Sequence, residues 1–194
     1  MEARLAPQVI SYNAAISACE KGVEWGQALH VLQQLQESKL ELVAASYNAA
    51  ISACEKGRQW ARAIVVFRTM QLDVVDPSTI TYSGLISACE KTKQWERALA
   101  LKDDMLCQSH LVPSVTVFNA AISACEKARR WKHALGLLRE LQALDIAPDA
   151  VTYSAAVSAC EKGLQWAWAL ALLEGMQRAD LRPELITYNA AISA

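Results

Sequence analysis

A repeat of about 35 residues constrains this 194-residue chain more than any other feature. Five of its six cysteines lie at intervals of 35, 35, 36 and 35 residues, and five of its six tryptophans keep the same intervals. A fixed period of about 20 to 50 residues is typical of solenoid proteins, in which each unit packs mainly on its neighbours. We therefore predict five complete units, at 9–43, 44–78, 79–114, 115–149 and 150–184, after a lead-in at 1–8 and before an incomplete sixth unit at 185–194.

Each unit has the pattern of two helices. Apolar and small residues recur at helical spacing from Tyr12 to Cys19 and again from Trp25 to Leu35, which gives each segment one buried stripe. Ser11 and its equivalents are the predicted N-caps, and Gly22 is predicted to end the first helix. No segment alternates with the period of a strand. The predicted fold is all-α: a right-handed α-solenoid (superhelix) of helix-turn-helix repeats of about 35 residues.

The repeated cysteines and tryptophans are predicted to be structural. Equivalent residues of adjacent units lie about 10 Å apart, whereas a disulfide needs Cα atoms within about 7 Å. The cysteines, with no Cys-x-x-Cys pair or Cys/His cluster among them, are therefore expected to be reduced core residues of an intracellular protein, without a disulfide or a metal. Cys107 lies outside the pattern. The tryptophans fit either a base-stacking platform or, as we favour, a wedge between the two helices of one unit.

Composition argues against several classes of function. The chain has 19 Lys and Arg against 20 Asp and Glu, a net charge of -1, which argues against binding nucleic acid or membrane through charge alone. Its longest strongly apolar run, residues 166–173, is far shorter than the roughly 20 residues of a membrane span. The sequence shows no nucleophile–base set, no paired carboxylates and no phosphate-binding loop. We therefore predict no enzyme, no catalytic residues, no cofactor, no small-molecule substrate and no membrane partner.

One face of each first helix is polar. Asn13, Ser17 and Lys21 have the spacing i, i+4, i+8, which places them on one face, and equivalent residues recur in every unit. In a stack, a row of amides and hydroxyls could read base edges while the lysines follow phosphates. A solvated surface that recurs because the unit was duplicated fits the pattern equally well. The glutamates that precede the lysines are predicted to point about 100° away round the helix and to weaken attraction at long range.

The unit resembles the pentatricopeptide repeat. The resemblance rests on the period, the Thr/Ser-Tyr-Asn/Ser opening and the late Pro-Asp, as in PDAVTYSAAVSACEKGLQWAWALALLEGMQRADLRP at 148–183. It implies sequence-specific binding of single-stranded RNA, one nucleotide per repeat, in organellar RNA processing, stability or editing in a mitochondrion or plastid. It also implies other proteins of an RNA-processing complex as partners. The alternative is a protein-protein interaction scaffold of tetratricopeptide type with no RNA role, although that repeat carries its Trp in the first helix.

The resemblance also assigns roles to residues. In the family, a base is read by the residue after the first-helix aromatic together with the last residue of the unit. The implied pairs are Asn13 with Val43, Asn48 with Ser78, Ser83 with Ser114, Asn119 with Asp149, and Ser154 with Glu184. By analogy, Asn–Ser favours cytosine at the second position and Asn–Asp favours uracil at the fourth. The implied base clamps are Ile10, Ala45, Ile80, Thr116 and Val151, and the implied phosphate contacts are Lys21, Lys56, Lys91, Lys127 and Lys162.

Overall fold

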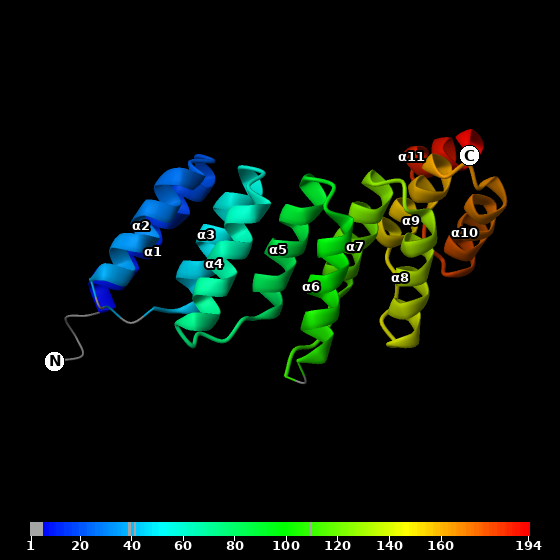
Figure 1. The fold of residues 1–194 in the computed structure, drawn as a ribbon. Helices are drawn as coiled ribbons and strands as arrows, with labels where there is room; N and C mark the ends of the chain where they lie inside the picture. The colour runs from blue at the N-terminus through cyan, green and yellow to red at the C-terminus, as the bar shows by residue number, and fades with distance from the viewer. Residues whose placement is uncertain (1–5, 39, 41, 109) are drawn as a thin grey trace. The chain divides into compact units, whose positions relative to one another are not determined.

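The computed structural model of the protein describes residues 6–38, 40, 42–108 and 110–194, so residues 1–5 of the predicted lead-in lie outside the described residues. Within these ranges every regular element is an α-helix (Figure 1). The chain forms two compact units, Met1–Thr92 and Lys93–Ala194, whose boundary falls between the two helices of the third repeat. The prediction of an all-α helical repeat fold is confirmed.

The first unit holds two helical hairpins and one further helix. Its elements are α1 (Ala6–Lys21), α2 (Trp25–Glu37), α3 (Ala44–Lys56), α4 (Trp60–Leu72) and α5 (Thr79–Lys91). The first helices pack side by side, α1 on α3 and α3 on α5, while α2 packs on both α1 and α3. Each second helix thus seals the junction between its own repeat and the next one, which leaves the first helices as a separate layer.

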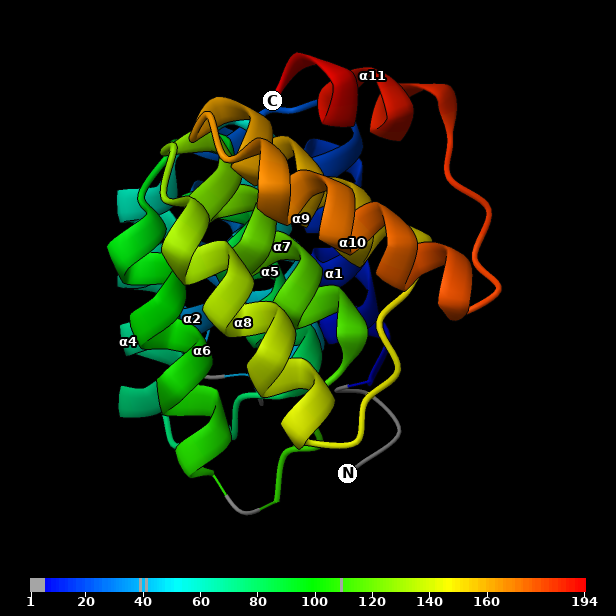
Figure 2. The same cartoon turned by 90° about the vertical axis from the view of Figure 1, so that its right-hand side faces the viewer.

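The second unit repeats this arrangement. Its elements are α6 (Trp95–Cys107), α7 (Val115–Lys127), α8 (Trp131–Ala143), α9 (Ala150–Lys162), α10 (Trp166–Arg178) and α11 (Leu185–Ser193). Here α7 packs on α9, and α9 packs on α11, while α8 contacts both α7 and α9. Figure 2 shows α6 and α8 together in one layer of this unit, with α7 and α9 in a second layer to their right.

The helix starts are correct for the second helices and displaced for the first. A tryptophan begins every second helix, as predicted, but α3, α5, α7 and α9 begin three residues before their aromatic residue. Their N-caps are Val43, Ser78, Ser114 and Asp149, and in α3, α5 and α9 the Ser or Thr predicted as the cap lies at the third helical position. Thr81 and Thr152 complete capping boxes with Ser78 and Asp149, in which cap and hydroxyl satisfy each other's backbone N–H groups.

The turn inside each repeat is a Schellman motif, whose left-handed residue is not glycine. Val23 has a φ of 60°, and the equivalent Arg58, Lys93, Arg129 and Leu164 have φ of 54° to 61°. In the first repeat, the N–H of Glu24 donates to the carbonyl of Cys19 at 2.9 Å, and that of Val23 to Glu20 at 3.2 Å. The predicted terminators occupy the preceding position, where Gly57 and Gly163 have φ of -76° and -91°. Their glycine therefore needs another explanation.

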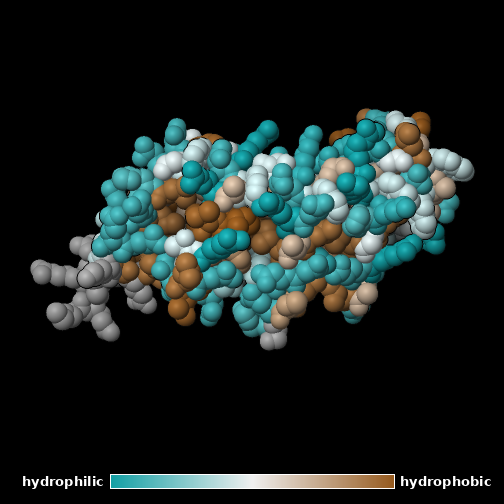
Figure 3. Space-filling view, in the orientation of Figure 1, coloured by the Kyte–Doolittle hydropathy of each residue, from teal (hydrophilic) through white to brown (hydrophobic). Residues whose placement is uncertain are grey.

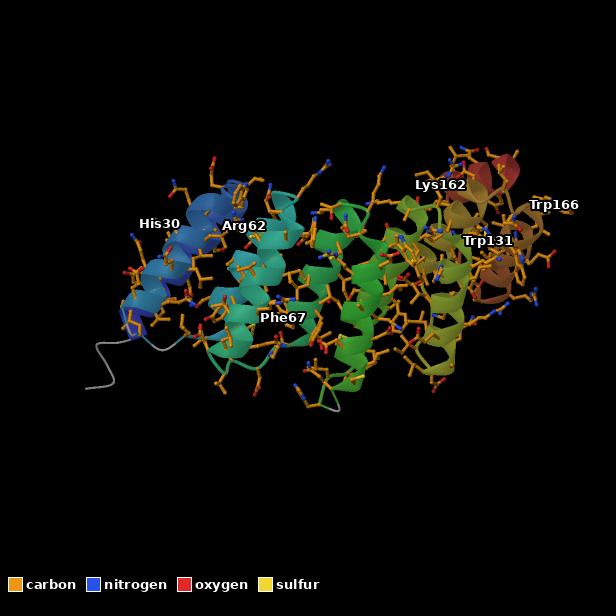
Figure 4. The ribbon with its side chains drawn as sticks, viewed as in Figure 1. His30, Arg62, Phe67, Trp131, Lys162 and Trp166 are labelled. Atoms are coloured by element: carbon orange, nitrogen blue, oxygen red, sulfur yellow. The ribbon has the colours of Figure 1, made fainter. Side chains whose placement is uncertain are left out.

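That explanation is the tryptophan of the preceding repeat. A Cβ at Gly57 would lie 2.5 Å from Cδ1 of Trp25, and a Cβ at Gly163 would lie 2.4 Å from Cδ1 of Trp131. Figure 4 labels Trp131 and Trp166, the first residues of α8 and α10. Trp25 and Trp131 therefore pack across the junction between repeats, and the prediction that they wedge between two helices of one unit is wrong. Trp166, which has no such turn following it in the described chain, is 64% exposed.

The predicted buried stripes are confirmed from the second repeat onward and form the core, whereas on α1 Tyr12 and Cys19 are only partly buried and Ala15 is exposed. In the second repeat, Tyr47, Ala50, Ile51 and Cys54 are buried on α3, and the equivalent residues are buried on α5, α7 and α9. None of the six cysteines, all of which the structure describes, forms a disulfide, and burial raises the pKa of Cys54, Cys125 and Cys160 to about 11. The core thiols are therefore protonated and protected, as expected for structural residues.

One buried charge was not predicted. Lys102 on α6 occupies a core position at which the second and fourth repeats carry Phe67 and Leu138, and its side chain is 4% exposed. Its Nζ lies 2.5 Å and 2.7 Å from the carboxylate oxygens of Glu140 on α8 and 2.7 Å from Asp103. The buried ammonium is thus paired across a repeat junction, as a buried charge must be.

The outer surface is mostly polar. On the face drawn in Figure 3, hydrophilic residues cover most of the area, and hydrophobic residues reach the surface in narrow areas between them. Among the described residues, no helix has the length and apolar character that crossing a membrane requires.

Candidate nucleic-acid interface

The amide side chains of the first helices are held in one orientation by the next repeat. Oδ1 of Asn13 accepts from the hydroxyl of Ser46 at 2.5 Å, and Oδ1 of Asn48 accepts from Thr81 at 2.7 Å. In the second unit, the hydroxyl of Thr152 lies 2.6 Å from Oδ1 of Asn119. Because the oxygen of each amide is engaged within the protein, the group left to face a ligand is the NH₂ donor.

The fourth repeat brings its implied reading pair into direct contact. Nδ2 of Asn119 donates to the two carboxylate oxygens of Asp149 at 3.1 Å and 3.3 Å. Asp149 is also the N-cap of α9, accepting from the backbone N–H of Thr152 at 2.8 Å. Burial raises the pKa of Asp149, but the hydrogen bonds from Thr152 and Asn119 outweigh it and hold the pKa below its usual value. The pair therefore presents an amide donor beside an ionised acceptor.

The second repeat joins its pair through a third residue. The hydroxyl of Thr81 donates to Asn48 and lies 3.2 Å from the hydroxyl of Ser78, which caps α5. Ser78 accepts from the backbone N–H of Thr81 at 3.4 Å, and because the proton of Thr81 is used on Asn48, Ser78 is the donor in their contact; its hydroxyl can rotate to donate to a ligand instead. This pair therefore presents two donors where the Asn119–Asp149 pair presents a donor and an acceptor.

The other implied pairs are less regular. Val43 is the N-cap of α3 without a side-chain hydrogen bond, so the partner of Asn13 offers no polar group. The hydroxyl of Ser154 lies 2.7 Å from that of Thr187, while Glu184, the N-cap of α11, is exposed. Ser83 belongs to the first unit and Ser114 to the second, where its hydroxyl lies 2.7 Å from that of Thr116.

The implied base clamps are exposed, and each lies two residues before the aromatic residue of its first helix. Ile10 and Ile80 of the first unit are 66% and 71% exposed, and Val151 of the second unit is 61% exposed. Ala45 and Thr116 are exposed at the equivalent position. Large aliphatic side chains that face solvent at the same register offer flat apolar surface beside the amide donors, which suits contact with the face of a base.

The lysines implied as phosphate contacts are largely ion-paired. Nζ of Lys56 lies 2.8 Å from Glu20 of the preceding repeat, and the same 2.8 Å separates Lys91 from Glu55. In the second unit, Lys162 lies 2.5 Å from Glu126. Lys21 and Lys127 occupy the equivalent ends of α1 and α7.

The role of the glutamates was missed because each helix was considered alone. Lys56 lowers the pKa of Glu20 below its usual value, and the hydroxyl of Ser52 also donates to Glu20 at 2.9 Å. A glutamate in one repeat and a Ser-x-x-x-Lys in the next would have been the sequence signal. The Ser and Lys positions of the predicted polar column therefore form, with these glutamates, a lysine ladder that joins adjacent repeats. Among the described residues, no cluster of His, Cys, Asp and Glu is placed to hold a metal ion.

Solved structures share this architecture. The chain resembles the crystal structure of the pentatricopeptide repeat protein PPR10 from maize, at 21% identity and a TM-score of 0.72, over 93% of this chain and 26% of that one. PPR10 in complex with an 18-nucleotide psaJ RNA element matches at 22% identity and a TM-score of 0.71, over 98% of this chain and 34% of that one. The chain thus spans about a quarter to a third of the PPR10 chains.

A further similar structure is the PPR domain of Arabidopsis thaliana protein-only RNase P 1, crystallised with tRNA. It matches at 14% identity and a TM-score of 0.77, over 90% of this chain and 91% of that one. No curated protein sequence matches the chain significantly. Two family models do: the pentacotripeptide-repeat region of PRORP matches residues 4–163, and the pentatricopeptide repeat domain matches residues 136–194. The chain therefore belongs to the pentatricopeptide repeat family.

Proposed function

We propose that the chain binds single-stranded RNA through its first helices and reads one base per repeat. The observation that carries this proposal is the pair Asn119–Asp149, in which Thr152 fixes the amide and Asn119 contacts the carboxylate. Solved relatives with this fold in complex with a psaJ RNA element and with tRNA support an RNA ligand. The process served, by family resemblance, is organellar RNA processing, stability or editing.

The hydrogen-bonding groups account for the two implied base preferences. Uracil carries a carbonyl acceptor next to an N–H donor on its Watson–Crick edge, which complements the donor of Asn119 and the acceptor of Asp149. Cytosine carries a carbonyl and an unprotonated ring nitrogen, so the carboxylate of Asp149 would face a lone pair. The two donors of Asn48 and Ser78 suit cytosine instead. Reading a base edge with such a pair contributes about 1–3 kcal/mol of discrimination.

A reciprocal exchange tests the assignment. Asp149→Ser gives the fourth repeat the pair of the second, and Ser78→Asp gives the second repeat the pair of the fourth; both replacements keep a good N-cap. Fluorescence anisotropy at low salt, with RNAs that differ at one position, should show preference moving from uracil to cytosine at the fourth position and from cytosine to uracil at the second. The expected change is about 5- to 100-fold.

The exchange also separates RNA binding from the scaffold alternative. If wild-type protein binds none of the RNAs at low salt, or binds all of them alike, the proposal of base reading is refuted. If preference changes at a position other than the one exchanged, RNA binding stands but the assignment of these pairs to bases is wrong.

A further inference from the structure

The turn between α7 and α8 carries the densest group of cationic side chains in the second unit. Arg129, Arg130, Lys132 and His133 surround Trp131 within five consecutive residues, and all four are exposed. Together with Trp131 they line a concavity of about 260 Å³. We refer to these four residues, of which Arg129, Arg130 and Lys132 are cations, as the turn cluster. Among the described residues, none of them is ion-paired to a carboxylate.

The turn cluster differs in this respect from the lysines at the ends of the first helices. Lys162 of the same unit is 2.5 Å from Glu126, so its charge is offset locally. An exposed ion pair that must be broken or shared offers little net attraction to a phosphate, whereas an unpaired cation releases counterions from RNA when it binds. Three cations within four consecutive residues, with no ion pair to a carboxylate, make the turn cluster a local concentration of positive charge that an anion can reach.

The side chains of the turn cluster are positioned by contacts that leave their charges available. The guanidinium of Arg130 lies 4.9 Å from the ring centroid of Trp95, and the ring of His133 lies 4.7 Å from it. Nε of Arg129 donates to the carbonyl of Lys162 at 3.2 Å. An arginine stacked on an aromatic ring keeps its in-plane N–H donors free. Because Arg129 and Arg130 are already held by these contacts, ordering them when RNA binds costs less side-chain entropy than ordering an unanchored lysine.

The turn cluster follows the C-terminal end of α7, and the reading pair of the fourth repeat lies near the start of that helix. Asn119 is the fifth residue of α7 and Lys127 is its last, which corresponds to a rise of roughly 12 Å at 1.5 Å per residue. When one base of a single-stranded RNA contacts Asn119 and Asp149, the phosphates on either side of that nucleotide lie away from the base. The RNA backbone can therefore pass over the C-terminal end of α7, where the turn cluster lies.

We propose that the turn cluster binds phosphates of the RNA and supplies most of the salt-dependent part of binding by the second unit. This inference rests on the proposed function, because it requires the same RNA to be bound. It assigns the phosphate contacts to residues outside the lysine column that the family resemblance implies, and it does not depend on which bases are read.

The test compares two variants of the full chain that remove equal numbers of positive charges from the turn cluster and from the lysine ladder. The cluster variant is Arg130→Gln with Lys132→Gln, and the ladder variant is Lys127→Gln with Lys162→Gln, so both variants lower the net charge of the second unit by the same amount. Binding of a fluorescein-labelled, random-sequence 15-nucleotide RNA is measured by anisotropy across a salt series, and circular dichroism confirms folding.

The cluster variant should reduce the slope of log K against log salt by about 1.4, because each phosphate contact to a single strand contributes about 0.7. At low salt its affinity should fall on the order of ten-fold or more. The ladder variant should change the slope by less than half as much. An unchanged slope in the cluster variant, or an equal fall in both variants, would overturn the proposal. Where the double variant fails to fold, the single change Lys132→Gln at an exposed position decides, with an expected slope change of about 0.7.

These outcomes are distinct from failure of the proposed function. Base reading is judged on the preference of wild-type protein and of the exchanged variants Asp149→Ser and Ser78→Asp, which does not depend on the salt slope. A protein that reads bases but keeps its full slope without the turn cluster would refute this inference alone.

Discussion

Replacing Gly163 with alanine should destabilise the second unit. The backbone alone would favour alanine, because any residue can adopt the φ of -91° found at Gly163. Replacing glycine also restricts the unfolded chain, which would stabilise the folded protein by about 0.4–1 kcal/mol. The added Cβ, however, would lie 2.4 Å, 2.8 Å and 3.1 Å from Cδ1, Cγ and Cβ of Trp131. These atoms are at the fixed base of a large side chain, so relief requires the whole ring to move.

Overpacking of this kind costs about 1–3 kcal/mol, so the expected net loss for Gly163→Ala is about 1–2 kcal/mol. We expect a loss of stability below the upper end of this range because the fourth repeat carries Ala128 at the equivalent position. There the preceding Trp95 lies against His133 and Arg130, which shows that another placement of the ring is available. Trp131 would have to find a comparable placement.

Gly136→Ala is the matched control in the same unit. A Cβ at Gly136, inside α8, meets no atom within 4 Å, so this substitution should stabilise the helix by about 0.5–1 kcal/mol. Urea unfolding followed by circular dichroism gives both values. If Gly163→Ala stabilises the protein as Gly136→Ala does, the packing of Trp131 across the junction is not what requires glycine. A double-mutant cycle with Trp131→Leu should recover most of the loss.

Two further predictions follow from the titratable groups. The pKa of Asp149 is depressed in the folded protein, so its contribution to stability is present above its unfolded pKa of about 4 and is lost as pH falls through the folded value. Asp149→Asn should therefore melt at a lower temperature than wild-type protein at pH 7, and this difference in melting temperature should shrink at about pH 3. A difference that is the same at both pH values would contradict this prediction. Among the thiols, exposed Cys107 should react rapidly with a thiol reagent such as DTNB, whereas Cys54, Cys125 and Cys160, buried with pKa values of about 11, should react only on unfolding. Rapid labelling of Cys107→Ser at these positions would show that the core opens.

The repeat made much of the fold predictable, because a period and a helical pattern together determine which residues face the core. Tyr47, Ile51 and Cys54 are buried as predicted, and Trp60 begins α4 as its equivalents begin the other second helices. Contacts between repeats were harder to predict. The role of Gly57 depends on the ring of Trp25, which lies in another repeat. The residues next to Gly57 in the sequence do not indicate this contact.

The same limit applies to the candidate interface. Asn119 and Asp149 could be paired only through the family resemblance, because thirty residues separate them and neither has a distinctive local pattern. The ion pair between Glu20 and Lys56 was overlooked for a related reason: a helical wheel places residues on faces of one helix and contains no information on the adjacent repeat. The exposed positions of Ile10 and Ile80 were visible in the sequence, since each precedes the buried stripe by two residues.

Helix capping restricts which residues can read a base. Ser78 and Asp149 are N-caps whose side chains accept from the backbone of the helix that follows, and the same side chains face the amides of Asn48 and Asn119 directly or through Thr81. Only short polar side chains cap well, so folding and recognition favour the same few residue types at the last position of a repeat. Val43 shows the reverse case: it neither caps α3 through its side chain nor offers Asn13 a polar partner. A change at this position therefore alters helix stability and base preference together, and stability must be measured alongside any altered preference.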